Sequence, residues 1–126
     1  MSERNADGMA VRREVLGDAH VDAVEARRSD FDEAFQTLIT EGAWGSVWAR
    51  DTISLRERSM LTIALLAACG NFDEIAMHIR ATANTGASPE DVIEALLHVA
   101  VYAGVPRANR AIGIARETYR EMGVEL

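Results

Sequence analysis

Apolar and polar residues repeat along this chain with the period of amphipathic α-helices. From residue 29 onward, four segments open with a small polar residue and an acidic residue three positions later, which is the pattern of a helix capping box. The four pairs are Ser29 with Asp32, Ser54 with Glu57, Asn71 with Glu74, and Ser88 with Asp91. Glycines stand where these helices are expected to end, at Gly42, Gly70, Gly86 and Gly104. A fifth helix is predicted between Pro106 and Gly123.

Two of the predicted helices are apolar around most of their circumference. They contain the runs Met60 to Cys69 and Val92 to Val101, and a helix of this kind is normally buried on every side. Three short neighbours give too little cover, so we expect contacts with further copies of the chain. No segment alternates with the two-residue period of a strand. The sequence therefore predicts an all-α fold, a compact and oligomeric bundle of about five to six helices.

The first 28 residues lack such a clear pattern. Residues 1–8 are polar, and we expect them to be disordered. Residues 9–28 carry few apolar residues among many charges, which suits an arm or a short helix laid on a neighbouring subunit. The predicted organisation is one domain over residues 9–126, with an arm at 9–28 and a helical core at 29–126.

Composition and charge restrict the class of function. The 126 residues are 48% hydrophobic and 26% charged, which is ordinary for a globular domain and argues against a disordered chain. The net charge is −7, so neither nucleic acid nor an anionic membrane is an expected partner. The sequence contains no lysine, which excludes Schiff-base and Walker-type chemistry. One cysteine, no secretory signal and no membrane-spanning run predict a cytoplasmic protein without disulfides.

One pair of residues has the spacing of a proton-transfer site. Glu74 and His78 are four positions apart, so both project from one face of a helix. A carboxylate beside an imidazole orients the ring and favours its protonated form, which makes it a proton donor. The alternative is an exposed pair in which Glu74 only completes its capping box. Arg80 lies about 200° around the helix from His78, which suits an arginine facing solvent or another subunit.

Two other groups are candidates for substrate binding. Trp44, Trp48 and Arg50 follow the first predicted helix in a loop, where they could line a flat acidic substrate or fill an interface. Arg107 and Arg110 open the last helix, where they could hold a carboxylate or simply flank a turn. The three histidines lack the ligand spacing of a metal site, so no metal is expected.

The chain resembles the 4-carboxymuconolactone decarboxylase family from about Val11 to Glu121. The order and spacing of several short motifs carry this resemblance. They are Val11–Gly17, Ala19–Asp22, Trp44-Gly45-x-x-Trp48-x-Arg50, Arg58–Thr62, Glu74-x-x-x-His78-Ile79-Arg80, Asn84-x-Gly86 and Ala100–Pro106.

The resemblance implies the fold of the alkylhydroperoxidase D-like superfamily and a homo-oligomer such as a hexamer built as a trimer of dimers. Peroxidase members of that superfamily use a glutamate, a CxxC pair and a downstream histidine. Aligning His78 with that histidine places Asn71 and Glu74 at the cysteine positions and Ser59 at the glutamate. Thiol redox chemistry is therefore not expected.

The family's reaction is loss of CO2 from 4-carboxymuconolactone, giving 3-oxoadipate enol-lactone in the protocatechuate branch of the β-ketoadipate pathway of aromatic catabolism. The leaving carboxylate is γ to the lactone carbonyl across a C=C bond, so the electrons left behind spread onto the carbonyl oxygen. No metal or cofactor is therefore expected. The resemblance implies that His78 donates the proton or stabilises the oxyanion, with Glu74 orienting it.

It also implies that arginines bind the carboxylates of this lactone substrate. Arg50 and Arg80 are the first candidates, and Arg12 from a neighbouring subunit is another. Trp48, together with Trp44, would line a dry site. Two alternatives remain open: a related enzyme that acts on another lactone or unsaturated acid, and a non-enzymatic helical oligomer.

Overall fold

The computed structural model describes residues 2–126, and these residues form helices and no strand. They contain seven α-helices, one π-helix and one 3-10 turn, so the all-α prediction is confirmed and the helices are more numerous than the five to six predicted. The chain divides into two compact units, Met1–Ser54 and Leu55–Leu126.

The first unit contains α1 (Glu3–Leu16), α2 (Asp18–Ala26), α3 (Glu33–Ile39) and the π-helix η1 (Thr40–Trp48). Residues 3–8 belong to α1, in contrast to the disorder predicted for them; Met1 lies outside the described residues. The Asn5 N–H donates to the Ser2 hydroxyl at 3.0 Å, which caps the helix. The Asn5 side chain donates to Glu41 at 3.1 Å, which ties α1 to η1.

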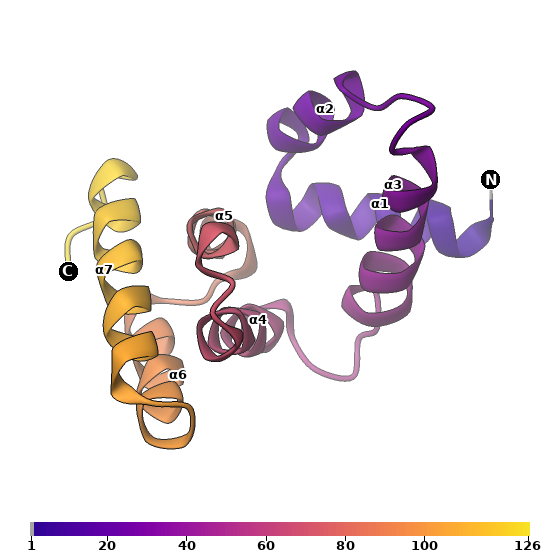
Figure 1. Cartoon of the computed structure of the whole chain (residues 1–126). Coiled ribbons are helices and arrows are strands. Elements are labelled where there is room, and N and C mark those ends of the chain that lie inside the picture. Colours follow the sequence, from indigo (N-terminus) through magenta and orange to yellow (C-terminus); the bar gives the residue numbers. More distant parts are fainter. Residues whose placement is uncertain (1) are drawn as a thin grey trace. The chain divides into compact units, whose positions relative to one another are not determined.

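Close contact between α1 and η1 depends on two glycines. A Cβ atom at Gly8 would lie 2.1 Å from the Thr40 carbonyl oxygen, and one at Gly45 would lie 2.5 Å from the Arg4 carbonyl oxygen. The missing side chains let the two backbones approach each other where they cross (Figure 1). Much of the segment predicted to be an arm or a short helix thus lies in helices of this unit.

η1 occupies the segment that the sequence predicted to be a helix end and a loop. The Ala49 N–H donates at 2.8 Å to the carbonyl of Trp44, five residues earlier, which is the bonding pattern of a π-helix. Gly42 has no left-handed backbone, so the predicted stop there is wrong. The glycine stops at Gly70, Gly86 and Gly104 do have positive φ angles, as predicted.

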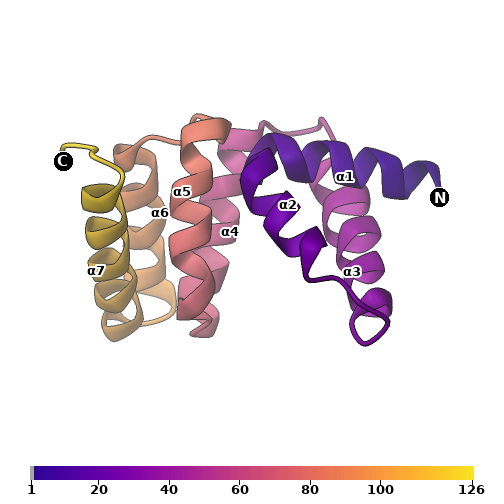
Figure 2. The same cartoon turned by 90° about the horizontal axis from the view of Figure 1, so that it is seen from above.

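The second unit contains α4 (Leu55–Cys69), the 3-10 turn η2 (Phe72–Glu74), α5 (Ile75–Thr85), α6 (Pro89–Tyr102) and α7 (Val105–Glu121). Figure 2 shows its four α-helices side by side. The capping box at α6 is confirmed, because Asp91 N–H donates to Ser88 Oγ at 3.1 Å and Ser88 N–H donates to Asp91 Oδ2 at 2.9 Å. The four helices enclose a core whose largest fully buried side chains are Ile63, Ile75, Ile79 and Leu96.

The two most apolar helices bury one face each. α4 buries Ser59, Ile63 and Ala67, while Leu61 and Leu65 are 54% and 62% exposed. On α6, exposed apolar residues recur every four positions at Ile93, Leu97 and Val101. The single chain therefore does not bury these helices on every side, and the subunit contacts expected from the sequence stay a prediction. No helix among residues 2–126 is both long enough and apolar enough to span a membrane.

Candidate active site

Glu74 and His78 lie one helical turn apart at the start of α5. Glu74 ends η2 and has a helical backbone conformation (φ −89°, ψ −10°), so the four-residue spacing keeps both side chains on one face. Glu74 is exposed, whereas His78 is 7% exposed between the fully buried Ile75 and Ile79. The pair thus combines a solvent-accessible carboxylate with an imidazole that is shielded from water.

An open hollow of about 570 Å³ lies beside Glu74. Most of its lining side chains are polar or charged, and they come from the turn between α4 and α5 and from α7: Asn71, Phe72, Asp73, Glu74 and Arg110, with the backbone of Gly70. The Arg110 guanidinium lies over the Phe72 ring, with Cζ 5.4 Å from the ring centre. The sequence did not predict a role for Phe72. No local pattern indicates its contact with Arg110, which is distant along the chain.

Arg80 points away from His78, as the helical period predicted. His78 is buried while Arg80 is half exposed, and the Arg80 guanidinium forms an ion pair with Glu121 near the end of α7. This contact joins α5 to α7. The role of Arg80 as a substrate anchor stays a prediction.

The predicted tryptophans lie together in the first unit. Trp44 and Trp48 are 6% and 7% exposed, and their ring centres are 5.0 Å apart with the planes tilted by 35°. Both residues lie in η1, so the prediction of a loop here is wrong. Their four-residue spacing is typical of one face of a helix. Arg50 follows η1 and is exposed.

Arg12 is a buried cation of α1. It is 5% exposed, and its Nη1 donates to Thr40 Oγ1 at 3.3 Å, while its Nε has no partner within residues 2–126. Burial lowers the pKa of the Arg12 guanidinium, and the negative charge of Glu25 acts in the opposite direction. A buried guanidinium with a single hydroxyl partner retains donors for an anion.

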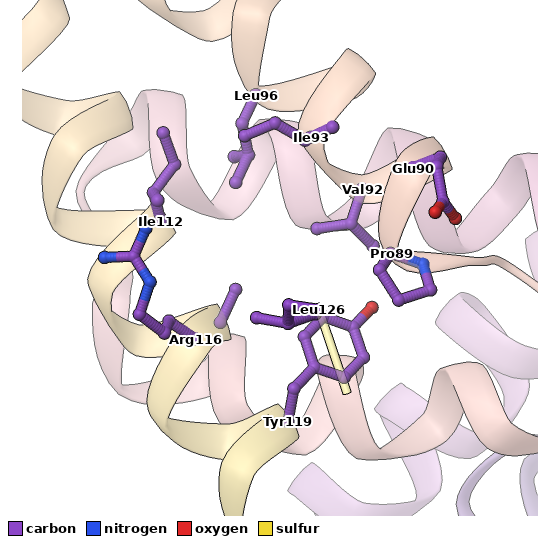
Figure 3. Close-up of a pocket in the computed structure, with 10 residues that line it drawn as sticks. Pro89, Glu90, Val92, Ile93, Leu96, Ile112, Arg116, Tyr119 and Leu126 are labelled. Atoms are coloured by element: carbon purple, nitrogen blue, oxygen red, sulfur yellow. The ribbon is translucent and has the colours of Figure 1, made fainter. Parts of the chain in front are cut away.

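A second pocket lies between α6 and α7 in the second unit. Figure 3 shows its lining, which is mostly apolar (Val92, Ile93, Leu96, Ile112, Tyr119 and Leu126) with Arg116 and Glu90 also present. Its volume is about 240 Å³. Neither Glu74 nor His78 lines it. Across the part of the chain that the structure describes, no three His, Cys, Asp or Glu side chains are grouped to hold a metal ion.

Comparison with known families places the chain in one of them. The model of the carboxymuconolactone decarboxylase family matches residues 33–117, which is more than half of the chain. The chain belongs to this family. The matched residues include Glu74 and His78 and exclude Arg12. The family resemblance inferred from the short motifs is therefore confirmed.

Relatives within the family act on different acids, according to their names. The chain is 40% identical over 122 residues to a 4-carboxymuconolactone decarboxylase from Acinetobacter baylyi, covering 97% of this chain and 91% of the relative. It is 35% identical over 116 residues to a nitrosuccinic acid decarboxylase from Metarhizium robertsii, covering 92% and 81%. A 43-residue stretch is 51% identical to a 4-carboxymuconolactone decarboxylase from Pseudomonas putida, covering 34% and 90%.

Proposed function

We propose that this chain is a carboxy-lyase that converts 4-carboxymuconolactone to 3-oxoadipate enol-lactone without a cofactor. The observation that carries the proposal is the placement of Glu74 and His78 one turn apart, at the N-cap and in the first turn of α5, within the part of the chain that matches the family. Identity of 40% to a relative of that name, over nearly the whole chain, supports the choice of substrate.

The reaction needs proton transfer and charge stabilisation. The C–C bond to the scissile carboxylate breaks, CO2 leaves, and the electron pair passes through the C=C bond to the lactone carbonyl oxygen. A proton is then delivered to the carbon next to that carbonyl, which gives the enol-lactone. The protein must hold the second carboxylate, stabilise the oxyanion and supply the proton.

In this proposal His78 is the proton donor, and Glu74 orients its imidazole ring. Burial of the imidazole keeps water away from the developing oxyanion and strengthens any hydrogen bond made to it. Glu74 faces solvent and the hollow, so it is suited to return a proton to His78 after each turnover.

Binding roles for Arg50, Arg12, Trp48 and Trp44 are part of the same proposal. The buried position of Arg12, and its Nε without a hydrogen-bond partner among residues 2–126, support an anion-binding role for that residue. The exposed apolar residues of α4 and α6 support a homo-oligomer, such as a hexamer assembled as a trimer of dimers. Sedimentation of the purified protein tests the assembly directly.

A second candidate substrate is nitrosuccinate, because the named relative that decarboxylates it is 35% identical to this chain. The two substrates share their chemistry. Each carries two carboxylates. Each also has a group that takes up the electrons left behind when CO2 departs: the conjugated carbonyl in the lactone and the nitro group in nitrosuccinate. One proton-donating pair therefore serves either compound.

The deciding experiment is an assay with 4-carboxymuconolactone generated in situ, with nitrosuccinate as the parallel substrate. CO2 and the enol-lactone are followed without added metal or thiol, in the presence of a chelator. Rapid turnover of the lactone supports the proposal, and turnover of nitrosuccinate alone replaces its substrate. No turnover of either compound by a folded oligomer contradicts it. Turnover abolished by the chelator would reassign Glu74 and His78 as metal ligands.

A further inference from the structure

The hollow beside Glu74 contains a cation that has no carboxylate partner. Arg110 makes no ion pair and no hydrogen bond within residues 2–126, although Asp73 and Glu74 line the same hollow. By contrast, Arg120 on the same helix is paired with Glu117. A guanidinium that faces an open hollow without a counter-ion is available to bind an anion.

Phe72 fixes the position of that guanidinium. The ring is half-buried and packs against the core of the second unit, so it is a rigid support. Arg110 lies over its face, and this contact leaves the N–H groups at the edge of the guanidinium plane. That edge is the one that binds a carboxylate with two parallel hydrogen bonds.

A second arginine raises the positive charge near the hollow. A Cβ atom at Gly70 would lie 2.4 Å from Nη1 of Arg107, so the Arg107 side chain lies against one of the residues that line the hollow. Like Arg110, Arg107 has no ion pair in the described part of the chain. Asp73, Glu74 and Arg110 line the hollow, and the charge of the adjacent Arg107 reduces the repulsion that the two carboxylates exert on an incoming anion.

We propose that Arg110 binds the substrate carboxylate that is retained in the product. This inference rests on the proposed function, and the hollow shares Glu74 with the proposed proton-transfer pair, whereas His78 is not among its lining residues. An ion pair to the scissile carboxylate would stabilise the ground state more than the transition state, because that charge is lost as CO2 leaves. An ion pair to the retained carboxylate stabilises the ground state and the transition state equally. It therefore strengthens substrate binding and leaves the rate of the chemical step unchanged.

Substitution of Arg110 tests this role through the separate values of KM and kcat. We expect Arg110→Gln to raise KM about 10- to 100-fold and to change kcat little, because one charge-assisted contact is lost. Arg110→Lys should recover part of the loss, since it keeps the charge without the planar fork. Phe72→Leu should raise KM by a smaller factor, because it removes the supporting ring. Arg116→Gln is the matched control, since Arg116 is also on α7 but lines the apolar pocket.

Direct binding separates this inference from the proposed function. The probe is 5-oxo-2,5-dihydrofuran-2-acetate, which keeps the lactone and the retained carboxylate but has hydrogen in place of the scissile one. Calorimetry should show binding to the wild type and to Arg116→Gln, and weaker binding to Arg110→Gln at unchanged oligomer mass. If Arg110→Gln turns over the lactone with an unchanged KM, or if KM rises only in Arg116→Gln, the inference is wrong. The proposed function is not affected by either result. If the wild type does not turn over the lactone, the proposed function is wrong. If the probe then binds equally to the wild type and to Arg110→Gln, or binds to neither, the inference is wrong as well.

Discussion

Arg80 on α5 donates to the Glu121 carboxylate on α7, so an arginine that the sequence offered as a substrate anchor already binds a carboxylate of its own chain. The two side chains are 50% and 48% exposed. Ion pairs at such exposure contribute about 1 kcal/mol or less to stability, because water screens the attraction. The contact therefore positions Arg80 without making it essential to the fold.

Paired substitutions distinguish the two roles of Arg80. We expect Arg80→Gln and Glu121→Gln to lower the free energy of unfolding equally, by about 1 kcal/mol or less, and to leave KM close to the wild-type value. Urea unfolding and steady-state kinetics measure both quantities. A KM increase in Arg80→Gln that is absent from Glu121→Gln would instead assign Arg80 to substrate binding.

Replacement of His78 should remove the reaction while the fold persists. We expect His78→Gln, which keeps much of the side-chain volume, to lower kcat about 10²- to 10⁴-fold, the usual contribution of a general acid. Glu74→Gln should cause a smaller loss, because it removes the orienting charge but leaves the imidazole in place. Turnover, circular dichroism and sedimentation are measured together.

The control for this pair is His98→Ala. His98 is exposed on α6 and stacks on Tyr102, with ring centres 6.3 Å apart, and it has no part in the proposed mechanism. It should keep wild-type activity. Unfolding or dissociation of both His78→Gln and Glu74→Gln, in place of a specific loss of turnover, would support a structural role for Glu74 and His78.

Local signals explain why most of the second unit was predictable. The Ser88–Asp91 capping box and the positive-φ glycines at Gly70, Gly86 and Gly104 involve residues within one or two turns of each other. α1 also has local signals at its ends, a capping serine at Ser2 and a positive-φ glycine at Gly17, but its position depends on the contact of Gly8 with the Thr40 region. Short helices are stabilised mainly by packing, and the packing partner lies more than two dozen residues away.

In the candidate site, too, the sequence predicted the features that depend on local helix geometry and not those that depend on tertiary contacts. The spacing of Glu74 and His78 predicted a shared face, and the helical period separated Arg80 from His78; both follow from the regular geometry of α5. The contact between Arg110 and Phe72 joins α7 to the turn before α5, so it arises only from the tertiary fold. No sequence pattern encodes such a pairing.

A methyl group at Gly8 should destabilise the protein, whereas one at Gly113 should not. At Gly8 the new Cβ would lie 2.1 Å from the Thr40 carbonyl oxygen, so the backbone must move, at a cost of about 1–3 kcal/mol or more. At Gly113, inside α7, nothing lies within 4 Å of the added atom. Alanine there should add about 0.5–1 kcal/mol through its better helix propensity.

Urea unfolding of Gly8→Ala and Gly113→Ala measures both effects, with sedimentation to detect changes in assembly. Wild-type stability of Gly8→Ala would contradict the close crossing of α1 and η1. A loss of stability in Gly113→Ala that accompanies a smaller assembly would indicate that another copy of the chain packs on Gly113.

The contribution of Asp91 to stability should depend on pH. Arg56 donates to its carboxylate from Nε at 2.7 Å and from Nη2 at 2.5 Å, and Ser88 N–H donates at 2.9 Å. These contacts, that of Arg56 first, hold the pKa of Asp91 well below its usual range. A carboxyl whose pKa is lower in the folded state stabilises the protein above its unfolded pKa of about 3.9, and this stabilisation is lost as pH falls through the folded pKa.

Asp91→Asn removes that dependence, because the amide does not titrate. At pH 7 the variant should unfold at lower urea concentration than the wild type, since it loses the ion pair with Arg56 that joins α4 to α6. The difference should shrink as pH falls below about 4, because the unfolded wild-type chain then takes up a proton at this carboxyl while the folded state still holds it charged. Asp30→Asn, at an exposed aspartate without an ion pair in the described residues, should differ little from the wild type at any pH. A constant difference between Asp91→Asn and the wild type from pH 7 to pH 3 would mean that the packing of the side chain, and not its charge, provides the stabilisation.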